Sequence, residues 1–224
     1  MDLQTALSNL ESMGTEQNRK TFTRHGAGKN LYGVSFANLN KLKKSIKVNQ
    51  PLAEELWATG NVDACILAAM IADPKLITSE QLDHWIRDTQ YYCLIDEFAK
   101  HVVSRTLFAM SKVEKWTTSE DEWIGRAGWQ TLACLALSKQ QIEDEVFEKF
   151  LMIIRDSIHQ RKNRTREAMN TALIAIGVRN EHLETVAKEA ARTIGQVHID
   201  HGDTSCKTPD AIAYIDKTNA RKKK

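Results

Sequence analysis

The segment Arg126–Leu137, RAGWQTLACLAL, is echoed by Arg166–Gly177, REAMNTALIAIG, at an offset of 40 residues. Each copy opens on arginine, has threonine as its sixth residue and is otherwise rich in alanine, leucine and other apolar residues. An acid-rich segment with helical apolar spacing follows each copy, at Gln140–Ile154 and at His182–Ile194. Asp63–Ala72 has the same alanine-rich character as the two copies. These segments predict a repeated unit of two helices, one largely buried and one amphipathic.

Paired helices with a period near 40 residues are typical of HEAT-like and armadillo-like arrays. We therefore predict an all-α fold, a helical repeat array that curves as an α-α superhelix and presents a concave surface made by the second helix of each pair. A non-repetitive helical bundle remains an alternative, because the echo depends mainly on alanine and leucine positions. The helices expected to line or back the concave side are Asp63–Ala72, Tyr91–Met110, Arg126–Leu137 and Arg166–Gly177.

The composition agrees with a helical protein. Only 3 prolines and 10 glycines occur in 224 residues, whereas sheet-rich folds need these residues at their many turns. No stretch alternates strictly enough between polar and apolar residues to predict a strand. The helices that we expect cover residues 2–12, 15–25, 35–47 with Ser35 as the N-cap, 52–58, 61–73, 78–88, 91–110, 119–137, 140–159, 164–178 and 181–195.

We expect one helical repeat domain over residues 1–195, followed by an extension over residues 196–224 that ends in a disordered basic tail, RKKK. No run of about 18 apolar residues predicts a membrane span, and the N-terminal segment lacks the apolar core of a secretory signal. The four cysteines show no CxxC spacing, and Cys65 and Cys134 lie in apolar runs typical of small buried residues. We expect a monomer in the reducing cytoplasm, associated with the nucleoid if the source is bacterial.

The charges are nearly balanced in total but unevenly distributed. The chain has 31 basic and 29 acidic residues, yet Gln17–Ala53 contains eight lysines and arginines and no acid. A second cluster, Arg155–Arg166, contains five basic residues and one acid. Such blocks indicate a polyanionic partner, nucleic acid first, although solvated helix faces are an alternative. The residues that we expect to contact nucleic-acid phosphates are Lys43, Lys44, Arg161, Lys162, Arg164 and Arg166.

Three segments match a known pattern in their order and spacing. Tyr32–Ala69 combines a Gly-Val after an aromatic residue, a basic helix, a Leu-Trp pair and an alanine-rich helix. Tyr91–Val103 places an aromatic residue four positions before an aspartate, and Glu122–Ala133 contains a Trp-x-x-Arg run. Together they resemble the DNA alkylation repair family of HEAT-like glycosylases, the AlkD-like proteins, over about residues 1–190.

The resemblance implies a DNA glycosylase that binds double-stranded DNA without a metal or another cofactor. Asp96 falls on the catalytic aspartate of the family, Tyr92 on an active-site aromatic residue and Arg126 on an active-site arginine that contacts DNA. The substrates would be N3- and N7-alkylated purines, which are already cationic leaving groups. A carboxylate beside the sugar would stabilise the developing oxocarbenium ion, and an aromatic face would stabilise the cationic base.

Other roles remain open for these residues. Asp96 could be an exposed helical acid or a partner of Arg126, Tyr92 could be a core residue, and Arg126 could form an ion pair between repeats. The family pattern also places an aromatic residue near Asn170–Thr171, where this chain has none. That departure favours a non-catalytic relative that binds bent or branched DNA, and a HEAT-like protein-interaction scaffold is a third possibility.

The tail residues His198, His201 and Cys206 are metal-ligand types, but a fourth ligand at tetrahedral spacing is not evident. We therefore expect no metal site.

Overall fold

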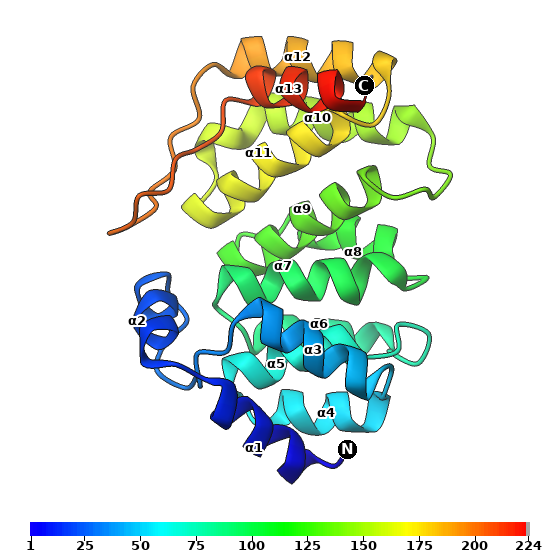
Figure 1. Cartoon of the computed structure of the whole chain (residues 1–224). Helices are drawn as coiled ribbons and strands as arrows, with labels where there is room; N and C mark the ends of the chain where they lie inside the picture. Colours follow the sequence, from blue (N-terminus) through cyan, green and yellow to red (C-terminus); the bar gives the residue numbers. More distant parts are fainter. Residues whose placement is uncertain (223–224) are drawn as a thin grey trace. The chain divides into compact units, whose positions relative to one another are not determined.

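The computed structural model describes residues 1–222, and its regular elements are helices. Contacts group the chain into two compact units (Figure 1). The first unit contains Met1–Ala109 with Gly202–Thr204, and the second contains Met110–His201 and the chain from Ser205 onward. Within residues 1–222 the backbone forms no strand, only an isolated bridge between Gly14 and Val34. None of the helices described combines the length and apolar character that crossing a membrane requires.

Helices α1 to α6 of the first unit begin and end within a few residues of the predicted bounds. Ser35 is the N-cap of α3, and its hydroxyl accepts a hydrogen bond from the backbone N–H of Asn38 at 3.3 Å. Pro51 lies in the first turn of α4. The elements are α1 (Leu3–Met13), α2 (Glu16–Arg24), α3 (Phe36–Ile46), α4 (Gln50–Ala58), α5 (Val62–Ile71), α6 (Ser79–Arg87), α7 (Tyr92–His101) and the 3₁₀ helix η1 (Val103–Arg105).

Helix α5 is the centre of the first unit. All its residues are buried, and it packs against α3, α4 and α7, as expected for a helix that is apolar nearly all round. Beside it, the rings of Trp57 and Trp85 stack at 4.2 Å between centroids, and Phe98 lies against both. The indole N–H of Trp57 donates to Asp88 at 3.3 Å, so its polar atom is satisfied.

The buried carboxylate of Asp63 fixes the loop before α3. It accepts hydrogen bonds from the backbone N–H groups of Tyr32, Gly33 and Val34 at 2.7, 2.9 and 2.9 Å. Gly33 has a φ of +78°, and a Cβ there would lie 2.7 Å from the backbone nitrogen of Arg19. The loop therefore requires glycine at this position. The N–H groups of Gly33 and Val34 need the carboxylate because both residues are buried.

The second unit confirms the predicted repeat. Its elements are α8 (Ala109–Trp116), α9 (Glu122–Ala136), α10 (Asp144–Ser157), the 3₁₀ helix η2 (Ile158–Gln160), α11 (Asn163–Gly177), α12 (Glu181–Ile194) and α13 (Ala211–Lys222). The two echoed segments are α9 and α11, which pack closely against each other, and the two acid-rich segments, α10 and α12, also pack together. A Cβ on Gly125 would lie 2.9 Å from the hydroxyl of Thr165, so glycine permits this close approach of α9 to α11.

Three structural predictions were wrong, two about the course of the chain and one about the burial of a cysteine. The single helix expected over Tyr91–Met110 is broken into α7, η1 and α8, and α7 ends at Val102, whose backbone is displaced from regular helical angles to φ −115° and ψ −76°. Downstream, Thr106 is extended, and its hydroxyl accepts from the N–H of Phe108 at 3.3 Å, which competes with helix continuation. Cys134 is half-buried, whereas Cys65 is buried as predicted.

The third wrong prediction concerns the end of the extension, where α13 forms a helix that the sequence analysis did not anticipate. Arg221 and Lys222 of the expected disordered tail belong to this helix, and the last two lysines of that tail lie outside the described residues. Helix α13 packs against α11 and α12, so this helical part of the extension belongs to the second unit.

We predict that Asp63→Ala lowers the free energy of unfolding by about 3 kcal/mol or more, because it leaves three backbone donors of the Tyr32–Val34 loop without an acceptor. Urea denaturation followed by circular dichroism measures the loss. Asp73→Ala is the matched control, since Asp73 lies in the same unit and accepts from one exposed backbone N–H, that of Lys75. Equal losses for the two variants would contradict the prediction.

Candidate nucleic-acid interface

Helix α7 carries two of the residues that the resemblance assigned to the site. Tyr92 is its first residue and Asp96 follows one turn later, so both lie on one face of the helix. Both side chains are half-buried. The Tyr92 hydroxyl lies 2.8 Å from Nδ1 of His25, the residue that ends α2. His25 thus holds the Tyr92 hydroxyl in place, a contact between residues 67 positions apart that no local sequence pattern indicates.

Positive charges gather where α3 and α7 end. Lys43 lies in the last turn of α3, Lys100 in the last turn of α7 and Arg105 in η1. Burial lowers the pKa of Lys43, and the charges of Arg105 and Lys100 lower it further, while Glu97 opposes them. Lys44, the other lysine predicted to contact phosphate in α3, is exposed. A bound anion near Lys43 would relieve the repulsion among these cations.

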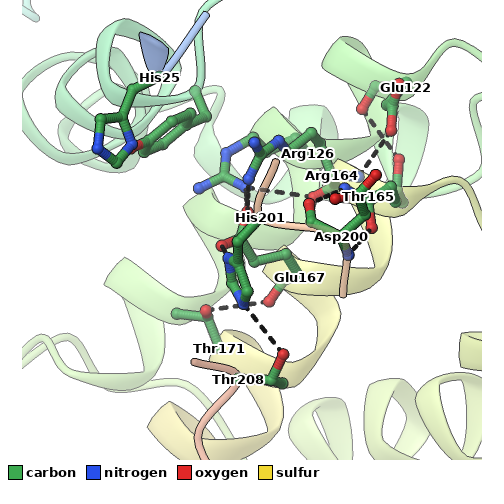
Figure 2. Close-up of polar contacts among 12 residues, drawn as sticks. His25, Glu122, Arg126, Arg164, Thr165, Glu167, Thr171, Asp200, His201 and Thr208 are labelled. Carbon is green, nitrogen blue, oxygen red and sulfur yellow. Dashed lines mark hydrogen bonds and ion pairs between the residues drawn. The ribbon is translucent and has the colours of Figure 1, made fainter. Parts of the chain in front are cut away.

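Arg126 lies in a buried ion-pair network of the second unit (Figure 2). Its Nη1 donates to Oε2 of Glu167 at 2.8 Å, and Nη1 of Arg164 donates to the same oxygen at 3.0 Å. Burial alone would raise the pKa of Glu167, but the two guanidinium groups outweigh it and hold that pKa below its ordinary value. Because Arg126 comes from α9 and Glu167 from α11, the contact is an ion pair between repeats. A DNA contact by Arg126, which is 4% exposed, remains a prediction.

The other predicted phosphate contacts of the second basic cluster have differing surroundings. Nη1 of Arg161 donates to Glu120 at 2.8 Å. Nη1 of Arg166 donates to the carbonyl of His198 at 2.8 Å, which ties the start of the extension to α11. Lys162 is exposed at the N-cap of α11. Neutralising the arginines would therefore disturb the fold of the second unit as well as any phosphate contact.

The tail histidine His201 belongs to the same network. Its Nε2 lies 3.1 Å from the hydroxyl of Thr208, and its Nδ1 lies 3.7 Å from Oε1 of Glu167 (Figure 2). Over residues 1–222, histidine, cysteine, aspartate and glutamate side chains form no group of three or more that could hold a metal ion.

An aromatic side chain does reach the neighbourhood of Thr171, although none is close to it in sequence. Tyr214 of α13 and Thr171 of α11 line the same pocket. The sequence analysis missed Tyr214 because it predicted no helix in the extension. The spacing of Tyr214, Thr218 and Arg221, at i, i+4 and i+7, is the signal that could have indicated a helical face there.

We predict that Glu167→Gln destabilises the protein by about 2 kcal/mol at pH 7, because two charge-assisted hydrogen bonds lose their anionic acceptor. The folded-state pKa of Glu167 is lowered from its ordinary value of 4.5. The stability that this carboxylate contributes is thus complete above that value and is lost as the pH falls through the lower folded-state pKa. Urea denaturation of the wild type and of Glu167→Gln from pH 7 to pH 3 should show that the difference between their free energies of unfolding becomes smaller as the pH falls.

Glu189→Gln, on the exposed face of α12, is the control and should leave stability nearly unchanged at each pH. A wild-type advantage over Glu167→Gln that stayed constant down to pH 3 would contradict the electrostatic explanation.

Comparisons with known proteins connect this arrangement to a family. A solved structure described as "a new family of proteins related to the HEAT-like repeat DNA glycosylases with affinity for branched DNA structures" matches with a TM-score of 0.91 and 32% identity, covering 99% of this chain and 95% of that chain. This likeness confirms the HEAT-like helical repeat fold predicted from the sequence.

Two curated relatives come from Listeria. The uncharacterized protein Lin0241 of Listeria innocua serovar 6a is 31% identical over 225 residues, which cover 98% of this chain and 96% of that protein. The uncharacterized protein Lmo0209 of Listeria monocytogenes serovar 1/2a is 30% identical over 227 residues, covering 99% and 97%. A family profile described as "DNA alkylation repair enzyme" matches residues 6–215. With nearly its whole length matched, the chain belongs to the DNA alkylation repair enzyme family.

Proposed function

We propose that this protein binds branched DNA, mainly through the phosphate backbone. The cluster of cations at the ends of α3 and α7 is the observation that carries the proposal. Lys43, Lys100 and Arg105 come from three separate elements, and burial lowers the pKa of Lys43, with the charges of Arg105 and Lys100 adding to that effect. Like charges brought together at a cost to folding are typical of an anion-binding surface. The likeness to a family with affinity for branched DNA supports a branched substrate.

The hydrogen-bond partners and the exposure of the basic side chains distinguish residues that are available to bind phosphate from residues that are already engaged within the protein. In the second unit, Arg161, Arg164 and Arg166 donate to carboxylate and carbonyl groups of that unit. In the first unit, Lys44 and Arg105 are exposed. We therefore assign the larger share of phosphate binding to the ends of α3 and α7, with Lys162 as a further contact.

We predict that the triple variant Lys43→Gln, Lys44→Gln, Arg105→Gln binds a four-way DNA junction more weakly than the wild type. The slope of log K against log salt concentration should also become shallower by roughly 0.9 for each phosphate that the variant no longer neutralises. Fluorescence anisotropy at several salt concentrations, with a linear duplex of equal length in parallel, provides both quantities. The wild type should prefer the junction.

Lys75→Gln serves as the control, since Lys75 is an exposed lysine of the same unit outside the basic block. An unchanged salt slope in the triple variant would show that these cations do not contact phosphate. Equal affinity of the wild type for junction and linear duplex would contradict the preference for branched DNA.

Excision of cationic alkylated purines is the second candidate function, and the arrangement on α7 favours it. Tyr92 and Asp96 share one helical face, and His25 holds the Tyr92 hydroxyl. In this proposal the ring of Tyr92 faces the cationic base. The carboxylate of Asp96 stabilises the positive charge that develops on the sugar as the glycosidic bond breaks.

We predict that Asp96→Asn reduces release of 7-methylguanine from alkylated DNA by about 100-fold or more, while affinity for that DNA stays nearly unchanged. A group that stabilises only the transition state does not contribute to ground-state binding. Chromatography of the released base measures the rate, and a melting temperature for each variant separates a defect in chemistry from a defect in folding.

Asp73→Asn is the control variant. If the wild type releases no base, the chain is a DNA-binding protein without this activity; full activity in Asp96→Asn would exclude Asp96 as the catalytic group.

A further inference from the structure

The second unit contains a pocket of about 580 Å³ between α11 and α13 that the proposed phosphate contacts do not use. Its apolar floor includes Ile174 of α11 and Val178, the residue that follows this helix, and both are buried. Tyr214 and Thr218 of α13 form the opposite wall, and Arg221 lies at its end. The volume is within the usual range for small-ligand sites. We call it the α11/α13 pocket.

Helix α13 is anchored firmly enough to hold this wall in place. Ile215 is fully buried, and a Cβ on Gly177 would lie only 2.5 Å from its Cδ1. The lack of a side chain at Gly177 is therefore what permits α13 to approach α11. Lys188 of α12 forms an ion pair with Asp216, and Asn219 donates to the carbonyl of Gly177 at 3.4 Å. These contacts fix α13 against α11 and α12, so the helix that carries one wall of the pocket is already in position before any ligand binds.

Tyr214 presents an aromatic surface that folding leaves available. Its exposed fraction is 51%, although α13 packs against two other helices. Tyrosine loses little conformational entropy when a partner covers it, because it has only two side-chain torsions. A flat apolar ligand could therefore lie against this ring and the floor of α11.

The charged residues that line the α11/α13 pocket are both positive. Among its lining residues, which belong to the described part of the chain, Arg221 and Lys222 are the charged ones. The ammonium group of Lys222 donates to the carbonyl of Val178 and so covers the negative end of the α11 dipole. Arg221 is exposed one residue earlier in the same helix. An anionic group at the rim would meet positive potential.

We propose that the α11/α13 pocket binds an unpaired nucleobase together with its neighbouring phosphate. Tyr214 is the stacking surface, and Arg221 is the phosphate contact. A nucleotide combines the two properties that the pocket selects, a flat apolar ring and an adjacent anion, and stacking on an aromatic side chain tolerates any base. The inference deepens the proposed function and rests on it, because branch points and frayed ends are where DNA offers unstacked bases.

The test uses the full chain and a thymidine trinucleotide with 2-aminopurine as its central base. The fluorescence of 2-aminopurine falls when the base stacks on an aromatic ring, so a titration reports affinity and stacking together. We expect saturable quenching with the wild type. Tyr214→Ala should weaken binding by about fivefold or more, whereas Tyr214→Phe, which keeps the ring, should stay within about twofold of the wild type.

The phosphate contact is tested with a matched pair of charge variants on one helix. Arg221→Gln should weaken trinucleotide binding and reduce the log–log salt slope by about 0.7. Lys217→Gln removes an exposed charge from the same helix, but Lys217 does not line the pocket. This variant should change neither the affinity for the trinucleotide nor the salt slope. Melting temperatures of all four variants identify any that loosen α13.

The outcomes separate this inference from the proposed function. Absence of quenching with the wild type, or equal affinities for the wild type and Tyr214→Ala, would overturn the nucleobase pocket even if the protein binds DNA junctions. If the wild type binds the trinucleotide specifically but does not bind junctions, the proposed function is overturned, whereas the inference about the pocket is supported. Quenching that disappears in Tyr214→Phe as well as in Tyr214→Ala would also overturn the pocket, because the ring alone should be sufficient.

Discussion

A carboxylate that is removed from water needs hydrogen-bond donors around it. Each unit of this protein is organised around one such acid, which is fully buried in Asp63 and half-buried in Glu167. In the first unit, Asp63 lies in the first turn of α5 and gathers three backbone N–H groups of the Tyr32–Val34 loop. In the second unit, Glu167 of α11 gathers guanidinium groups from Arg126 and Arg164. In both, one acid on a nearly buried helix determines how the neighbouring elements approach, because any other arrangement leaves a charge or several donors without partners.

This requirement divides the basic residues between structure and binding. A guanidinium group engaged with Glu167 or with a main-chain carbonyl has fewer donors left for phosphate, and moving it would expose a buried acid or an unsatisfied carbonyl. Lys44 and Lys162 are exposed instead, and an ammonium group on a flexible stem is easily hydrated at the surface. Charge counted along the sequence therefore overestimates the binding surface in the second unit. It is a better guide in the first unit, where Lys44 and Arg105 are exposed.

The C-terminal extension changes the chemistry of the second unit. Arg166 holds its beginning through the carbonyl of His198, and Ile215 anchors its end against Gly177. Between these points the extension brings Tyr214 and two cations to a surface of α11 that has no aromatic residue of its own. An added helix can thus supply a binding group to a repeat without altering the repeat, because packing in such arrays involves only neighbouring elements.

The sequence by itself determined the all-α class, most helix bounds and the recurrence of α9 as α11, because periodicity, caps and glycine positions act locally or through a repeated pattern. It also identified Tyr92 and Asp96 as neighbours, since a spacing of four residues on a helix places side chains on one face. Only the tertiary structure decided that His25 contacts Tyr92, that Glu167 neutralises Arg126 and that Tyr214 reaches the pocket at Thr171. These contacts join residues about 40 or more positions apart, and they depend on how closely two helices approach, which is a property of packing and leaves no periodic trace in the chain.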